Sequence, residues 1–98
     1  MLGDRIGAAE AERIGMIYKL YDDGEFEGAS MALASVLAQM PTRALAYTKH
    51  ALNSSAANSL ESQLLLEDEL QQQASKTKDY AEGVQSFLQK RPAEFKGE

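Results

Sequence analysis

Apolar side chains recur at three- and four-residue spacing through most of this chain, the pattern of helices that bury one face. The spacing predicts helices over residues 8–14, 24–39, 42–52, 59–74 and 78–91. Clusters of turn residues separate them, and the clearest is the run NSSAANS at residues 53–59. Helices joined by such short connections indicate a mainly α fold of the bundle or hairpin type.

Particular residues mark where these helices begin and end. Asp23, Asn58 and Thr77 are candidate N-caps because their side-chain oxygens can accept a backbone N–H, and a glutamate three residues after Asn58 has capping-box spacing. Gly15 is the expected left-handed residue after the first helix. Pro92 is expected to end the last helix, since it cannot continue one.

The last helix has one apolar face, formed by Tyr80, Val84, Phe87 and Leu88. Gly83 lies in its interior, where glycine costs about 1 kcal/mol relative to alanine. Two explanations remain open: another element or a ligand approaches the backbone closely, or the helix tolerates a weak residue.

The helix over residues 59–74 carries more leucine than one neighbouring helix could cover. Its apolar positions spread beyond a single stripe, and they are Leu60, Leu64, Leu65, Leu66 and Leu70. A helix that is apolar on more than one face is usually buried between several others. We therefore expect this surface to meet another subunit, a larger part of the same protein, or both.

The chain divides into a hinge segment, residues 1–24, and a helical region, residues 25–98. The hinge holds the short first helix and then Met16–Tyr21, which is partly β-branched and aromatic. This stretch is either a short strand paired with the Arg5–Ile6 region or irregular backbone.

Composition narrows the class of protein. The 98 residues carry a net charge of −5, which argues against nucleic acid as a partner, because phosphate binding needs a basic surface. The chain has no cysteine, so it forms no disulfide or thiolate metal site, and this fits a reducing, cytoplasmic location. No apolar run approaches about 20 residues, so no membrane partner is expected.

The chain shows no catalytic constellation. His50, the sole histidine, has no partner motif and is interpreted as a helix-surface residue. Glu67, Asp68 and Glu69 are consecutive and fan around a helix, so they cannot chelate one ion together. The loop serines lack an activating base and suit capping roles. We expect no metal ion and no cofactor.

Sequence runs along the whole chain resemble one family. The segments GDRIGAAEAERIGMIYKLYDD, NSLESQLLLEDELQ and DYAEGVQSFLQKRPAEF are similar to the C-terminal part of enoyl-CoA hydratase/isomerase (crotonase) enzymes. Within that family the likeness is greatest to the branch of phenylacetate breakdown that isomerises a ring-epoxide phenylacetyl-CoA.

The resemblance implies a fold and a function. It implies the C-terminal helical trimerisation region of a crotonase fold, with the spiral β/α core that carries the catalytic groups preceding Met1 and absent here. The parent enzyme would isomerise or hydrate an unsaturated or ring-epoxide acyl-CoA through an oxyanion-stabilised thioester enolate. This piece would supply subunit association and part of the coenzyme A (CoA) cover, and by itself it is expected to be inactive.

Two positions carry the expected CoA contacts. The resemblance places Phe87 against the adenine and Lys90 near a CoA phosphate. Alternatively, Phe87 is an ordinary core residue, and Lys90 and Arg91 are surface cations that complement the helix dipole. A competing hypothesis for the whole chain is a stand-alone helical protein-interaction module with no CoA chemistry.

The broad leucine surface predicts self-association. We expect a dimer, trimer or larger homo-oligomer, native-like or domain-swapped, because 98 residues offer little polypeptide to cover this surface. Light scattering at tens of micromolar protein measures the mass, and a clean monomer would contradict the expectation.

Overall fold

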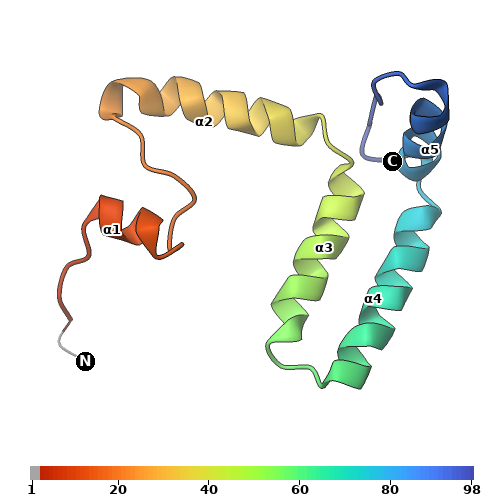
Figure 1. Ribbon diagram of the computed structural model, residues 1–98, viewed down its shortest axis with the longest axis horizontal. Coiled ribbons are helices and arrows are strands. Elements are labelled where there is room, and N and C mark those ends of the chain that lie inside the picture. Colours follow the sequence, from red (N-terminus) through yellow and green to blue (C-terminus); the bar gives the residue numbers. More distant parts are fainter. Residues whose placement is uncertain (1–2) are drawn as a thin grey trace. The chain divides into compact units, whose positions relative to one another are not determined.

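The structure, a computed structural model, describes residues 3–98, and these contain helices and turns but no strand (Figure 1). The helices are α1 (Ala8–Arg13), α2 (Asp23–Ala38), α3 (Thr42–Ser55), α4 (Leu60–Ser75) and α5 (Lys78–Gln89). The predicted mainly α class is confirmed. The chain forms two compact units, Met1–Ala34 and Ser35–Glu98. No helix in the described part is long and apolar enough to cross a membrane.

Among the described residues of the first unit, one small side chain is buried, that of Ala11. The Ala11 carbonyl accepts hydrogen bonds from the N–H groups of Met16 and Ile17 at 2.8 and 3.3 Å. Gly15 has φ +75°, so it is the left-handed residue expected after the first helix. Of the two alternatives for Met16–Tyr21, the irregular one is observed, because the N–H groups at its start turn back toward α1 and do not pair with a strand.

The second unit is built on an antiparallel hairpin of α3 and α4, followed by α5 (Figure 1). Gln63 links the two hairpin helices, since its amide nitrogen donates to the Ala51 carbonyl at 3.2 Å. The side chain of Asn58 donates to the Gln63 oxygen at 3.0 Å. Leu70 is the one large apolar side chain of the described residues that is buried, at 8% exposure.

Two of the three predicted N-caps are wrong by one residue. The cap of α4 is Ser59, whose hydroxyl accepts the Ser62 N–H at 3.2 Å, while the Asn58 side-chain nitrogen donates to the Gln63 oxygen. At the start of α2 the Asp22 carbonyl accepts the first helical hydrogen bonds, so Asp23 already lies inside the helix. The third prediction, Thr77, is confirmed by a hydrogen bond of 3.1 Å from the Tyr80 N–H.

Helix α3 is one turn longer than predicted. It extends through Asn53–Ser55, and only residues 56–59 form the connection. The Ser55 hydroxyl donates to the Leu52 carbonyl at 2.8 Å, which satisfies a carbonyl near the helix end. Small polar residues are therefore compatible with the last turn here.

Helix α5 ends before Pro92, at a left-handed residue. Lys90 has φ 54° and ψ 40°. The Lys90 N–H donates to the Phe87 carbonyl at 3.2 Å, and the Arg91 N–H donates to the Ser86 carbonyl at 3.0 Å. This is the Schellman arrangement, which normally has glycine at the left-handed position. Lysine there costs about 1 kcal/mol.

The C-terminal tail, residues 91–98, folds back along α5 (Figure 1). The Asp79 carboxylate accepts hydrogen bonds from the backbone N–H groups of Lys96 at 2.7 Å and Gly97 at 2.8 Å. The Asp79 N–H donates in turn to the Glu98 carbonyl at 3.1 Å. Asp79 is only 4% exposed, so these bonds satisfy a carboxylate that is largely withdrawn from water.

A second carboxylate holds the beginning of the tail. Glu82 makes a two-bonded pair with the Arg91 guanidinium, at 2.5 and 2.8 Å, and accepts the Glu94 N–H at 2.9 Å. These donors stabilise the charged form, so they lower the pKa of Glu82 from 4.5 to about 2.

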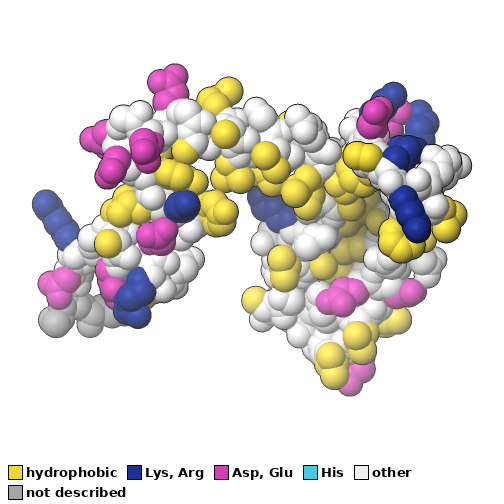
Figure 2. Space-filling view, turned by 45° about the horizontal axis from the view of Figure 1, so that its top comes forward, with side chains coloured by type: hydrophobic (Ala, Val, Ile, Leu, Met, Phe, Trp, Pro, Cys, Tyr) yellow, Lys and Arg dark blue, Asp and Glu magenta, His cyan; other side chains and the backbone are white. Residues whose placement is uncertain are grey.

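Most large apolar side chains of the described residues remain on the surface. Figure 2 shows hydrophobic side chains exposed on both units. In the second unit Leu65 is 73% exposed. The other large apolar residues exposed there include Leu52, Leu60, Leu64, Tyr80, Val84, Phe87 and Leu88. The expectation that the leucines of α4 are too broadly distributed for this chain to bury is confirmed.

Two glycines near the tail predict opposite effects of alanine. An added Cβ at Gly83 would lie 3.6 Å from the Phe95 ring, an ordinary contact, so Gly83→Ala should stabilise the second unit by roughly 0.5–1 kcal/mol. Gly97 has φ +75°, and its added Cβ would lie 2.5 Å from the Thr42 hydroxyl. Gly97→Ala should therefore destabilise the unit by roughly 1–2 kcal/mol. Urea unfolding followed by circular dichroism compares them, and equal stabilities would contradict the tail geometry.

The Glu82 contact predicts a defined acid sensitivity. Because the folded-state pKa lies below the ordinary value, the contact stabilises the tail above about pH 4.5 and is lost as the pH falls toward 2. The carboxyl carbon shift of Glu82, followed by NMR, should titrate near pH 2, and Arg91→Gln should move that midpoint toward 4.5. A midpoint near 4.5 in the unaltered chain would be inconsistent with the ion pair.

Candidate functional site

An apolar groove runs along α5 within the second unit. It has a volume of about 500 Å³. One wall comes from Pro41 and Ala44 at the start of α3 and Ala74 at the end of α4. The other comes from α5 and the tail, with Tyr80, Gly83, Val84, Phe87, Leu88 and Phe95.

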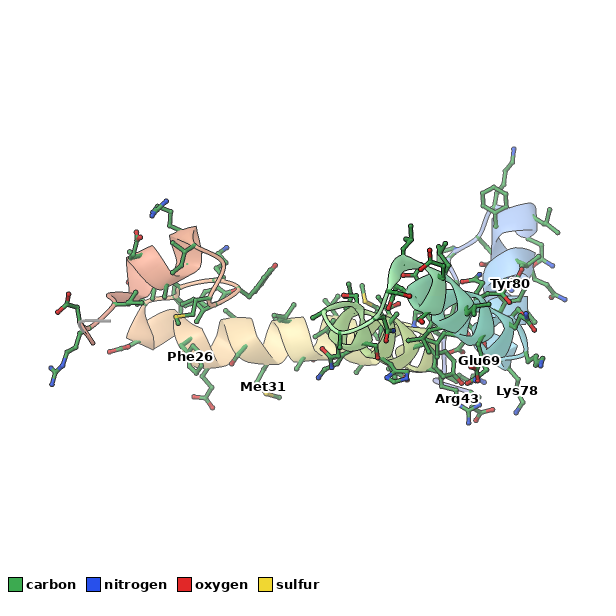
Figure 3. The ribbon with its side chains drawn as sticks, turned by 90° about the horizontal axis from the view of Figure 1, so that it is seen from below. Phe26, Met31, Arg43, Glu69, Lys78 and Tyr80 are labelled. Carbon is green, nitrogen blue, oxygen red and sulfur yellow. The ribbon has the colours of Figure 1, made fainter. Side chains whose placement is uncertain are left out.

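The sequence of α5 explains why the groove forms. Its apolar residues recur on one helical face, beginning with Tyr80 near the start of the helix (labelled in Figure 3). The returning tail places the Phe95 ring over Gly83 on that face, at a distance that would also admit a Cβ. Two explanations for Gly83 were open, close approach by another element or a ligand and tolerance of a weak residue. Among the described residues only the Phe95 side chain approaches, at an ordinary contact distance, which favours tolerance within this chain.

The structure places the two predicted CoA-contacting residues together at the end of α5. Phe87 lines the groove and is 83% exposed, so in this chain the core alternative is wrong for it. Lys90 follows within one helical turn, and its N–H donates to the Phe87 carbonyl. An exposed aromatic ring therefore lines the groove, and Lys90 follows it in the chain at the end of α5.

Two of the surrounding cations form ion pairs with carboxylates. Arg91 pairs with Glu82, and Lys78 pairs with Glu98 at 2.5 Å. The Lys78 ammonium lowers the pKa of Glu98. Within residues 3–98, no ion pair involves Lys90. Among the described residues of this region, Lys90 therefore has a charge available to an anionic ligand, and so does Lys96, which is in no ion pair either.

A second, polar depression adjoins the tail and does not favour anions. Its lining combines three cations with four carboxylates, namely Lys78, Arg91 and Lys96 with Asp79, Glu82, Glu94 and Glu98. The positive charges are matched or exceeded by negative ones, so this surface is not attractive for a phosphate.

Other residues singled out from the sequence lie elsewhere. His50 is exposed on α3, as predicted. The consecutive carboxylates of α4 accept amide hydrogen bonds from different glutamines: Glu67 from Gln63, Asp68 from Gln72 and Glu69 from Gln73. The described residues contain no acidic, histidine or cysteine grouping that could hold a metal ion.

Sequence reasoning missed three residues that shape the groove. The pattern indicates for Asp79 only a first-turn acid suited to the helix dipole, and it assigns no role to Glu82 or Phe95. A signal was available, since an acidic pair at three-residue spacing precedes a tail with Arg91 and Gly97. It was weak, because helical periodicity does not show that a tail reverses direction.

Sequence comparison identifies relatives along the full chain. The family model described as enoyl-CoA hydratase/isomerase matches residues 1–98. A probable enoyl-CoA hydratase of Rhodobacter capsulatus is 41% identical over 97 residues, covering 99% of this chain and 38% of the relative. The 1,2-epoxyphenylacetyl-CoA isomerase of Escherichia coli is 40% identical, covering 99% and 37%. The chain thus spans less than two fifths of these relatives.

Solved structures agree with the sequence relatives. An enoyl-CoA hydratase structure from Geobacillus kaustophilus is similar with a TM-score of 0.90 and 29% identity, covering 98% of this chain and 36% of that one. The enoyl-CoA hydratase EchA1 of Mycobacterium marinum has a TM-score of 0.86 and 28% identity, covering 98% and 38%. With the family match over its whole length, the chain belongs to the enoyl-CoA hydratase/isomerase family.

Proposed function

We propose that this chain is the C-terminal helical region of an acyl-CoA hydratase or isomerase, where it supports subunit association and covers part of the bound CoA. The observation that carries the proposal is an exposed Phe87 in an apolar groove, followed by Lys90 at the end of the same helix, in a chain of this family. This piece contributes to substrate binding, and the rest of the enzyme performs the chemistry.

The chemistry of the two side chains suits the two parts of CoA. The Phe87 ring offers a flat apolar face on which an adenine can stack. The Lys90 ammonium is a point charge that can contact a phosphate from a flexible stem. The groove beside them presents apolar groups, which suits the less polar part of the same ligand.

The acyl group is proposed from the relatives. The E. coli relatives include a 1,2-epoxyphenylacetyl-CoA isomerase and a 2,3-dehydroadipyl-CoA hydratase, both named for CoA thioesters. The parent enzyme would accordingly isomerise or hydrate an unsaturated or ring-epoxide acyl-CoA through a thioester enolate stabilised by backbone N–H groups. Its proposed setting is phenylacetate catabolism in the cytoplasm.

The chain by itself is proposed to be inactive. Proton transfer in this chemistry needs a carboxylate placed at the reacting carbon. The carboxylates of α4 accept hydrogen bonds from glutamines of the same helix, and those of α5 are occupied by the tail. Asp79 lines the groove, but its oxygens accept the N–H groups of the tail, so it is not proposed as a general acid or base.

One observation favours a second function. The apolar surface that includes Leu60, Leu64 and Leu65 remains exposed, as expected of a helical interaction module without CoA chemistry. Such a module would bind another protein through these leucines and would have no need for the Phe87–Lys90 pair. Affinity for CoA separates the two functions.

Titration with CoA tests the proposal. Weak binding is expected, and Lys90→Ala should weaken it severalfold, since a charge-assisted contact to phosphate is lost. Lys49→Ala, which removes an exposed lysine of α3 outside the groove, is the matched control and should bind as the unaltered chain does. NMR shift changes give the dissociation constants, and crotonyl-CoA should be bound without turnover.

Absence of CoA binding, or equal losses in the two lysine variants, would favour the interaction module. Turnover of crotonyl-CoA well above background would contradict the proposed inactivity of the chain alone.

A further inference from the structure

Lys90 adopts a backbone conformation that its side chain disfavours. It is the one non-glycine residue with positive φ among residues 3–98, at 54°. Glycine would take this position in the Schellman arrangement without strain. A strained residue persists where its surroundings determine its conformation, and such residues concentrate at sites where the side chain is used.

The surroundings that determine it lie in the tail. After Lys90 the chain must reverse and follow α5 back toward its first turn. Two carboxylates one turn apart on α5 hold this path. Glu82 accepts the Arg91 guanidinium and the Glu94 N–H, and Asp79 accepts the N–H groups of Lys96 and Gly97.

These anchors are suited to a rigid connection. Both bonds from Arg91 to Glu82 are charge-assisted, and the planar guanidinium fixes their direction. Asp79 is nearly inaccessible to water, and its acceptor bonds to two successive N–H groups leave the tail little rotational freedom. Both carboxylates are negatively charged and would repel a ligand phosphate, so holding the tail suits them better than contacting the ligand.

We propose that Asp79 and Glu82 are positioning residues, which hold the tail so that Lys90 stays left-handed and its ammonium is oriented toward an anionic group of the ligand. The proposal rests on the proposed CoA contact of Lys90. A lysine whose backbone is already ordered loses less conformational entropy on binding. Releasing either anchor should therefore weaken binding by about two- to tenfold.

The experiment uses the 98-residue chain and adenosine 3′,5′-bisphosphate as the probe, because it carries the adenine and phosphate groups without the acyl arm. Asp79→Asn and Glu82→Gln each remove one anchor charge at nearly constant size. Glu94→Gln is the control, since it removes one negative charge from the same tail and leaves both anchors in place. Lys90→Gln sets the loss expected when the ammonium itself is absent.

Two measurements are made on each variant. The coupling between the Lys90 amide and α protons, with its carbonyl and Cα shifts, reports whether the residue remains left-handed. NMR titration gives the dissociation constant of the probe. The side-chain amide signals of Gln63, which bridges α3 and α4, verify that the hairpin is still folded.

The proposal expects the left-handed signature to disappear in Asp79→Asn and Glu82→Gln but not in Glu94→Gln. Both anchor variants should bind the probe more weakly, and combining either with Lys90→Gln should cause no further loss. An intact Lys90 signature in both anchor variants would overturn the proposal, whatever the affinities. So would tighter binding by Glu82→Gln, which would show that the released Arg91 binds the anion.

Failure of the underlying function has a different signature. If Lys90→Gln bound the probe as the unaltered chain does, the CoA contact of Lys90 would be refuted. The amide–α coupling of Lys90 in the anchor variants would then be the only test of whether the tail keeps the Lys90 backbone left-handed.

Discussion

The structure of the C-terminal end of this protein depends on the hydrogen bonds that the Asp79 carboxylate accepts from the tail. This carboxylate is nearly buried, and a buried carboxylate without donors would be strongly destabilising. The N–H groups of Lys96 and Gly97 supply the donors, and they can do so only if the chain reverses after α5. The position of Phe95 on Gly83, one wall of the groove and the left-handed Lys90 all follow from this reversal.

The second constraint is the amount of apolar surface that the chain leaves uncovered. Leucines of α4 and the apolar face of α5 remain exposed, and the described residues bury few apolar side chains. The chain also spans only 38% of its Rhodobacter capsulatus relative and 37% of the Escherichia coli isomerase. Together these facts support the proposal that the helices belong to a larger enzyme, in which other parts cover them.

The proposed division of labour follows from the same two constraints. Carboxylates that could transfer protons are engaged in holding the tail or in hydrogen bonds along α4. What remains available is the Phe87 ring in the groove and the charge of Lys90 at the end of α5. We propose that these groups bind and orient a ligand, whereas the reaction itself is performed by the rest of the enzyme.

Side-chain periodicity and capping rules predicted the helices correctly, and their errors at the helix ends were one to three residues. Thr77 was predicted correctly because its cap bond to Tyr80 spans three residues of the same segment. The prediction of Asn58 as a cap was wrong, because the next residue, Ser59, supplies the accepting oxygen, while the Asn58 side chain donates to Gln63. The weak helix propensities of Asn53–Ser55 predict a loop, yet these residues complete α3.

By itself the sequence determined the number and type of helices, the breadth of the apolar faces and the placement of Phe87 and Lys90 near one helix end. These properties depend on side-chain periodicity and on hydrogen bonds between residues three or four apart. Only the tertiary structure decided that the tail reverses, because its bonds join residues separated by 12, 17 and 18 positions. Such contacts depend on where the backbone turns, and no periodic pattern encodes that direction.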